Sequence, residues 1–145
     1  MTQILGVDFG QVRIGVAISD ELGLLAHPLE TIPAEKALPR ISEIVREKKI
    51  SEVIVGVPRT MSGEIGTAAK EAIAFVEKLR ATLPCRVVTW DERLTTSEAH
   101  RALQSAGKKT RETRGYIDQV AAQIILQGYL DRQRGDAGSA QEMSP

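Results

Sequence analysis

The first third of the chain alternates between short apolar runs and turn residues. Residues 3–9 and 13–19 are rich in β-branched residues and glycine, and Gly10-Gln11-Val12 separates them. Such runs on either side of a short turn predict two strands joined as an antiparallel hairpin. Residues 24–32 predict a third extended segment, and Pro28, which has no backbone N–H, favours an edge position for it.

After Pro33 the apolar positions change to a helical period. Leu38, Ile41, Ile44 and Val45 fall on one helical face, which predicts a helix over about residues 35–48. Residues 52–57 (EVIVGV) form a continuous apolar run closed by a proline, which is typical of a strand covered on both faces.

A second helix and a further strand follow. The helix ends before Pro84, residues 86–90 predict the strand, and the apolar stripe of the helix consists of Ala69, Ala72, Ile73, Val76 and Leu79. Thr95 and Glu98 fit a capping box at the start of a third helix, which Gly107 ends.

The last predicted helix carries its apolar stripe on Ile117, Val120, Ala121, Ile124 and Ile125. Residues 135–145 offer nothing to bury, so we expect one domain over residues 1–134 and a disordered tail. The order of elements predicts an α/β fold, a mixed five-stranded sheet of three antiparallel strands followed by βαβ crossovers, with helices on both faces. This succession matches the ribonuclease H-like architecture.

Composition narrows the function classes. The chain has 145 residues, which suits one domain, and its 19 Lys and Arg balance 19 Asp and Glu, which argues against a globally basic nucleic-acid binder. Cys85 is the single cysteine, and with only His27 and His100 beside it neither a disulfide framework nor a zinc site is supplied. Without a leader or a long apolar segment, we expect a cytoplasmic protein with no membrane partner.

Three acidic positions stand out because each lies at a strand end or a helix start. Asp8 ends an apolar strand, where it either bonds the turn amides near Gly10, pairs with Arg13 across the hairpin, or serves a site. Asp91 and Glu92 follow the fifth strand, and at most one of two adjacent residues in a strand faces a given site.

Asp118 lies on the apolar stripe of the last helix, an unusual place for a charge unless it only favours the helix start. Carboxylates from three distant segments would be suitable ligands for one or two magnesium or manganese ions. Two such ions activate a water and stabilise the leaving oxygen of a phosphodiester hydrolysis.

Four blocks, in order, cover about residues 3–131 and closely resemble the YqgF (RuvX) family. They are Asp8-Phe9-Gly10 with Arg13-Ile14-Gly15-Val16-Ala17, Gly56-Val57-Pro58, Asp91-Glu92-Arg93-Leu94-Thr95-Thr96 with Ala99, and Asp118-Gln119-Val120-Ala121-Ala122 with Ile125-Leu126. The resemblance implies a ribonuclease H-like fold and a metal-dependent nuclease that matures the 5′ end of pre-16S ribosomal RNA. The family has also been described as a Holliday-junction resolvase by analogy.

Carried over by motif, the resemblance implies Asp8, Glu92 and Asp118 as catalytic metal-binding acids, with Asp91 as the alternative to its neighbour. Arg13 and Arg93 would orient the acids or bind substrate. One feature departs from resolvases of similar fold, which carry an acid at the end of the strand that here reads Gly56-Val57-Pro58. This departure favours RNA processing over junction cleavage.

A basic segment precedes the last helix and offers phosphate contacts: Lys108, Lys109, Arg111 and Arg114 surround one acid, Glu112. It is otherwise a solvated charge run. With 3% aromatic residues, we expect recognition of structured RNA through shape and backbone.

Three alternatives to an RNA nuclease stay open. A junction resolvase predicts paired nicks in four-way DNA and a homodimer in place of a monomer. A catalytically silent ribosome assembly factor predicts RNA binding without cleavage. A nucleotide-binding module of the actin and sugar-kinase type is disfavoured, because 145 residues supply only half of that two-domain clamp.

Overall fold

The computed structural model describes residues 3–58, 66–92 and 111–143, with the side chains of the last helix described over residues 116–135. Five strands form one mixed sheet: β1 (Ile4–Asp8), β2 (Arg13–Ser19), β3 (Ala26–Pro33), β4 (Glu52–Val57) and β5 (Arg86–Asp91). Their order across the sheet is β3-β2-β1-β4-β5. The first three strands pair antiparallel, and β4 pairs parallel with both β1 and β5. The predicted mixed sheet is therefore confirmed, with the proline-containing β3 at an edge.

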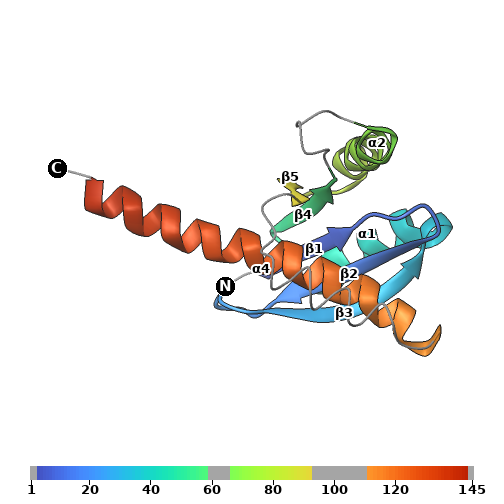
Figure 1. Cartoon of the computed structure of the whole chain (residues 1–145). Helices are drawn as coiled ribbons and strands as arrows, with labels where there is room; N and C mark the ends of the chain where they lie inside the picture. Colours follow the sequence, from blue (N-terminus) through green and yellow to red (C-terminus); the bar gives the residue numbers. More distant parts are fainter. Residues whose placement is uncertain (1–2, 59–65, 93–110, 144–145) are drawn as a thin grey trace.

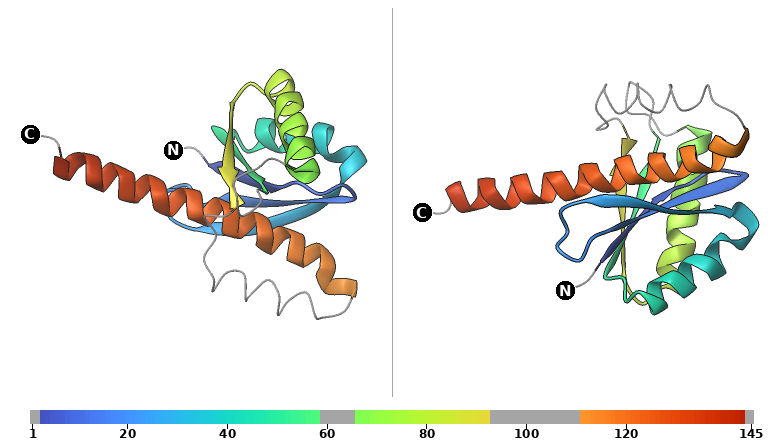
Figure 2. Two further views of the ribbon diagram at one scale, coloured as in Figure 1. Left: turned by 45° about the horizontal axis from the view of Figure 1, so that its top comes forward. Right: turned by 90° about the horizontal axis from the view of Figure 1, so that it is seen from below.

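Helices cover both faces of the sheet (Figures 1 and 2). A short 3-10 turn, η1 (Ala34–Lys36), leads into α1 (Ala37–Glu47), and α2 (Thr67–Thr82) connects β4 to β5. These two helices pack on one face, whereas α4 (Arg111–Met143) crosses the other. The helix expected from Thr95 to Gly107 lies outside the described residues.

Alternate residues of the strands pack on opposite faces of the sheet, as the pleat of a strand requires, so each face has a core of its own. Leu5, Val7, Val53 and Val55 face α1 and α2 in the larger core. The smaller core lies under α4 and contains Ala17, Ile54, Trp90, Ala122, Ile125, Leu126, Tyr129 and Leu130. The buried stripe of α4 thus runs through Ala122 and Leu126, and the expected positions Ala121 and Ile124 are only partly buried.

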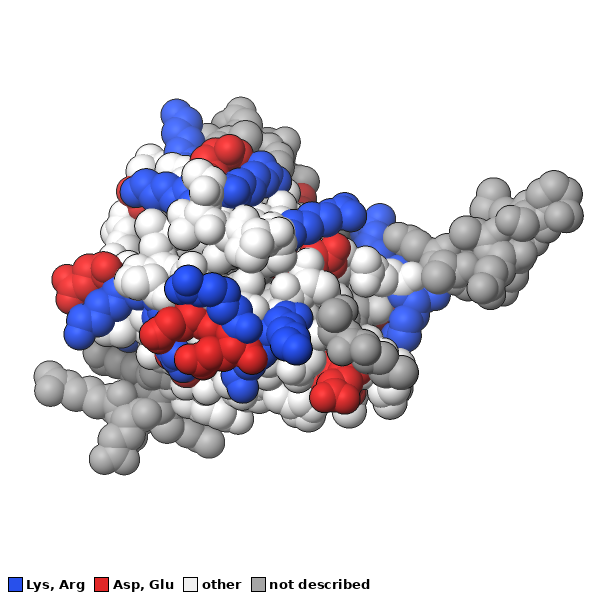
Figure 3. All heavy atoms as spheres, turned by 180° about the vertical axis from the view of Figure 1, so that it is seen from behind, with Lys and Arg blue, Asp and Glu red and all other residues white. Residues whose placement is uncertain are grey.

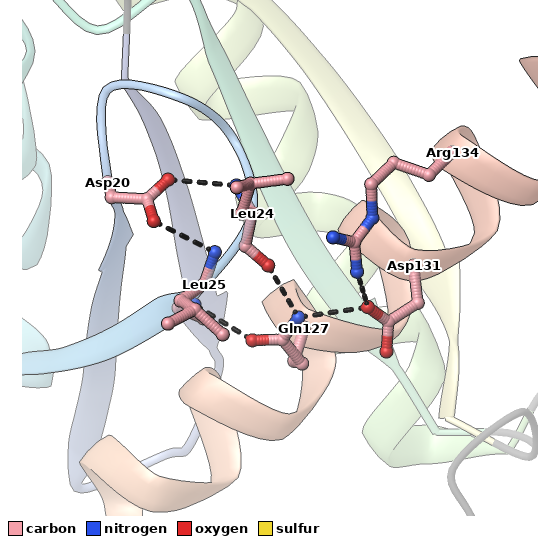
Figure 4. A network of polar contacts seen from close by, with 7 residues as sticks. Asp20, Leu24, Leu25, Gln127, Asp131 and Arg134 are labelled. Carbon is pink, nitrogen blue, oxygen red and sulfur yellow. Dashed lines mark hydrogen bonds and ion pairs between the residues drawn. The ribbon is translucent and has the colours of Figure 1, made fainter.

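Two glutamines of α4 form hydrogen bonds with the backbone at the start of the edge strand β3. Gln127 accepts a hydrogen bond from the Ala26 amide at 2.8 Å and donates to the Leu24 carbonyl at 2.9 Å, while Gln123 donates to the Ala26 carbonyl at 2.9 Å. In the same network Asp20 accepts from the amides of Leu24 and Leu25 (Figure 4). The helix therefore satisfies backbone groups that an edge strand would otherwise leave unpaired.

Helix α4 extends past residue 134, where the domain is expected to end. The helix continues to Met143, and its last turns project beyond the sheet (Figure 1). Ala137, Ala140, Gln141 and Glu142 favour helix, and no proline interrupts the chain before Pro145. Among the helices that the structure describes, none is long and apolar enough to cross a bilayer.

Candidate active site

The site is centred on Asp8, which has a glycine beside it on each neighbouring strand. Asp8 pairs in register with Gly15 of β2 and with Gly56 of β4. Laterally paired residues point to the same face of a sheet, so the Asp8 side chain lies on the α4 face between two positions without side chains. This arrangement leaves room around the carboxylate for groups from other elements.

Gly15 lets α4 lie directly against β2. A Cβ atom at this position would lie 1.9 Å from the carbonyl oxygen of Asp118, a distance that no side chain can occupy. Gly6 is similarly crowded, since its Cβ would lie 2.7 Å from the Cβ of Leu126. This role of Gly6 and Gly15 was not predicted, although glycines within otherwise β-branched strands signal a close approach of another backbone.

Gly56 gives space to the carboxylate of Glu92. A Cβ at Gly56 would lie 3.1 Å from Glu92 Oε1 and 2.4 Å from Ile125 Cδ1. Glu92, just beyond the end of β5, thus reaches over the strand end that carries no acid of its own. The departure noted in the sequence is compensated in space, because the acid absent from β4 is replaced by one from the next strand.

The electrostatics of Asp8 show that three carboxyl groups come together. Burial, the charges of Glu92 and Asp118, and a hydrogen bond with Glu92 raise the pKa of Asp8 to about 8. Desolvation and nearby like charges both favour the protonated acid. Asp8, Glu92 and Asp118 therefore form one acidic cluster at the ends of β1 and β5 and the start of α4.

Arg13 pairs with Asp118, not with Asp8 across the hairpin as the short sequence separation suggested. Its Nε lies 2.7 Å from Asp118 Oδ2, although 105 residues separate the two in the chain. The pairing follows from the sheet, because Arg13 lies two residues before Gly15 and thus on the same face of β2.

The carboxylate oxygens of the acidic cluster suit a hard cation, but Asp118 is already paired with Arg13. Within residues 3–58, 66–92 and 111–143, no three His, Cys, Asp or Glu side chains already form a metal-ligand group. Asp8 and Glu92 share a hydrogen bond, and Arg13 holds Asp118. A divalent ion bound by oxygen ligands would take the place of the Asp8 proton and of the guanidinium.

The structure also separates Asp91 from Glu92. Asp91 pairs in register with Val57, which packs against Ala69 and Ala72 of α2. By the alternation of the strand, Asp91 lies on the face opposite Asp8, so Glu92 is the neighbour of Asp8. Arg93, Lys108 and Lys109 lie outside the described residues, as do the side chains of Arg111 and Arg114 at the start of α4.

Comparisons with known proteins agree with this fold and with the four sequence blocks. The family model described as "RuvX: Holliday junction resolvase" matches residues 2–132. Two relatives named "Putative pre-16S rRNA nuclease" come from Nocardia farcinica and Chloroflexus aggregans. The first is 51% identical over 94% of this chain and 84% of its own, and the second is 48% identical over 90% and 94%.

Among solved structures, the chain is similar to Thermus thermophilus RuvC, with a TM-score of 0.58 and 15% identity over 92% of this chain and 97% of the other. At that identity the likeness shows the ribonuclease H-like fold alone. The family match spans nearly the whole chain and includes both strand ends and the helix that carry the acidic cluster. The chain belongs to the RuvX family.

Proposed function

We propose that this protein is a divalent-metal-dependent nuclease that hydrolyses phosphodiester bonds of structured RNA, in the maturation of the 5′ end of pre-16S ribosomal RNA. The names of its relatives support the substrate. The observation that carries the chemistry is the position of Asp8 between Gly15 and Gly56, since Asp118 packs against the first glycine and the Glu92 carboxylate against the second. The raised pKa of Asp8 agrees with three carboxyl groups gathered there. Repulsion between the carboxylates of such a cluster opposes their ionisation, and a bound cation removes this repulsion.

Asp8, Glu92 and Asp118 hold one or two magnesium or manganese ions in this proposal, and Asp91, on the opposite face of the sheet, is not among the ligands. When bound, the metal supplies an activated water and stabilises the leaving oxygen. Arg13 pairs with Asp118 in the metal-free protein, and because nearly half of its side chain is exposed it is available to a phosphate once an ion takes its place. Arg93, Lys108, Lys109, Arg111 and Arg114 contribute further phosphate contacts, which makes RNA binding salt-dependent.

The surface charge fits a nuclease that grips its substrate locally. Lys and Arg are interspersed with Asp and Glu on the face seen from behind (Figure 3). A chain with no net charge has no long-range attraction for RNA. Contacts close to the acidic cluster therefore have to supply the affinity for RNA. A role in ribosomal-RNA maturation would place the protein in the cytoplasm.

Cleavage of a pre-16S RNA fragment with manganese tests the proposal. Wild type is expected to cut, whereas Asp8→Asn and Asp118→Asn fold but lose at least about 10³-fold in rate, because each removes a charged metal ligand. Asp131→Asn is the matched control, an exposed aspartate on the same helix, and keeps full activity. Equal rates in Asp118→Asn and wild type would refute the assignment.

Cleavage of four-way DNA junctions is the second candidate, favoured by the description of the matching family. It predicts paired, symmetric nicks and a homodimer, whereas the RNA nuclease has no need of two sites in register. A preference for linear precursor RNA over junctions removes this candidate. Metal-independent RNA binding without cleavage of either substrate would identify a non-catalytic assembly factor.

A further inference from the structure

A groove lies between the turn after β1 and helix α2, on the face of the sheet opposite the acidic cluster. It consists of two adjoining hollows of about 320 and 350 Å³, and Phe9, Gln11 and Glu71 line both. Phe75 lines one hollow and Pro58 the other. Their volumes are at the small end of ligand sites, which span ~300–1,000 Å³. Such a groove suits a single planar group better than a duplex.

The wall of this Phe9 groove is aromatic in a protein that has few aromatic residues. Phe9 and Phe75 are the only two phenylalanines of the chain, and both line the groove. Their ring centroids lie 5.1 Å apart with a tilt of 34°. Phe75 is buried, whereas Phe9 is partly exposed. A partly exposed ring supported from below is a stacking surface for a nucleobase.

The polar groups of the groove suit the hydrogen-bonding edge of a base. The Gln11 side-chain amide donates to Glu71 Oε2 at 2.7 Å across the groove. A carboxylate accepts two hydrogen bonds side by side, which complements the adjacent N1–H and N2–H donors of guanine. The Gln11 amide can then donate to the guanine O6. Lys78 also lines the groove and provides a cation for a neighbouring phosphate.

The groove and the proposed catalytic centre lie on opposite faces of the same strand end. Phe9 directly follows Asp8, and successive residues at a strand end point to opposite faces of the sheet. An RNA strand that crosses this end of β1 would present a phosphate to the acidic cluster on one side and a base to the groove on the other.

We propose that the Phe9 groove binds one unpaired guanine of the RNA substrate, stacked on Phe9 and hydrogen-bonded to Glu71. The proposal rests on the nuclease function, since it assigns a base-recognition subsite to the same RNA. It also adds one base contact to the expected recognition of structured RNA through shape and backbone.

Binding of short RNAs by the full-length protein tests the groove. The probes are fluorescein-labelled five-nucleotide single strands with guanine or adenine at the centre, measured by anisotropy with EDTA to prevent cleavage. Wild type is expected to prefer guanine about five- to tenfold, the scale of one stacked and hydrogen-bonded base. Glu71→Gln removes the preference for guanine. Phe9→Leu weakens the binding of both probes, because it removes the aromatic ring and keeps an apolar side chain in the groove.

A pair of tryptophan variants provides the matched control. Ala74 lines the groove and is exposed, so Ala74→Trp obstructs it without disturbing the core. Ala81, two turns further along α2, is equally exposed and does not line it, so Ala81→Trp leaves binding unchanged. Equal unfolding midpoints of the two variants show that the obstruction is local.

The outcomes separate the groove from the nuclease function. If wild type cuts precursor RNA while Ala74→Trp and Glu71→Gln alter neither affinity nor base preference, the groove is refuted and the nuclease function stands. If the guanine preference is present and is lost in these variants while no precursor is cut, the groove stands and the nuclease function fails.

Discussion

The two faces of the sheet consist of alternate residues of the same strands, yet they are built differently. The face under α1 and α2 carries large aliphatic side chains that are almost fully buried: Leu5, Val7, Ile14, Val16, Val53 and Val55. The face under α4 also buries Ile54 and Trp90, but around the strand ends and along β1 and β2 it carries glycine, alanine and an acid: Gly6, Asp8, Gly15, Ala17 and Gly56.

This difference shows how the fold separates stability from chemistry. Large side chains on the first face hold the helices at a distance and bury apolar area, which stabilises the fold. Small residues on the second face bring α4 so close that carboxylates from three segments meet. The second face accepts repulsion between like charges there, as functional sites commonly do.

Replacing Gly15, on the face of the sheet under α4, with alanine should have the largest effect on stability. Gly15→Ala places a Cβ 1.9 Å from the Asp118 carbonyl oxygen, so α4 has to move away. We expect a loss of about 3 kcal/mol or more in the free energy of unfolding, at the upper end of overpacking effects. Urea denaturation measures it.

Val16→Ala, the next residue on the opposite face, is the control for that prediction. It removes two buried methyl groups and should cost about 2 kcal/mol. A smaller loss for Gly15→Ala than for Val16→Ala would contradict the close-approach role of Gly15.

Asp8→Asn should stabilise the metal-free protein at pH 8. The pKa of Asp8 rises from its ordinary value near 3.8 to about 8 on folding, so the folded state holds this proton more tightly than the unfolded state. Wild-type stability therefore falls as the pH rises from about 4 to 8, and Asp8→Asn removes this slope. We expect a gain of a few kcal/mol at pH 8, from denaturation in EDTA.

Asp20 is the control, because folding lowers its pKa, whereas folding raises the pKa of Asp8. Hydrogen bonds from the Leu24, Leu25 and Gly23 amides lower the pKa of Asp20, so its contribution is present at neutral pH and is lost as the pH falls through its folded pKa. Asp20→Asn should thus give no gain at pH 8. Wild-type stability that stays flat between pH 5 and 8 would argue against the raised pKa of Asp8.

Arg13→Met should tighten manganese binding about fivefold, because it removes the cation that competes for Asp118. Isothermal titration of the metal measures this effect without RNA. Arg40→Met, which removes an arginine paired with Glu30 and Glu43, should leave the affinity unchanged. Weaker binding in Arg13→Met would instead show that the guanidinium orients Asp118 for the ion.

Gln127→Ala should have the smallest effect, about 1 kcal/mol, because it leaves the buried Ala26 amide without its helix partner. Faster hydrogen exchange of that amide measures the loss locally. Gln133→Ala, whose glutamine donates to Tyr129 and not to the sheet, should not change it. Unchanged exchange in Gln127→Ala would show that the edge does not depend on the helix.

Local patterns in the sequence were enough to predict the five strands, the edge position of β3 and the place of Asp118 on the covered face of α4. Alternation and helical periodicity depend on neighbouring residues, so they can be read without coordinates. They could not locate the full buried stripe of α4. Ala122 and Leu126 are buried because they pack against Gly6 of β1, which is distant in the chain.

The sequence by itself determined which acids end strands or begin a helix, since composition and spacing mark those places. Only the tertiary structure decided that Glu92, not Asp91, reaches Asp8, that Arg13 binds Asp118, and that both phenylalanines line one groove. Each of these depends on how closely segments far apart in the chain can approach. Packing of backbone against glycine sets that distance, and a glycine within a strand signals a close approach without showing which distant segment makes it.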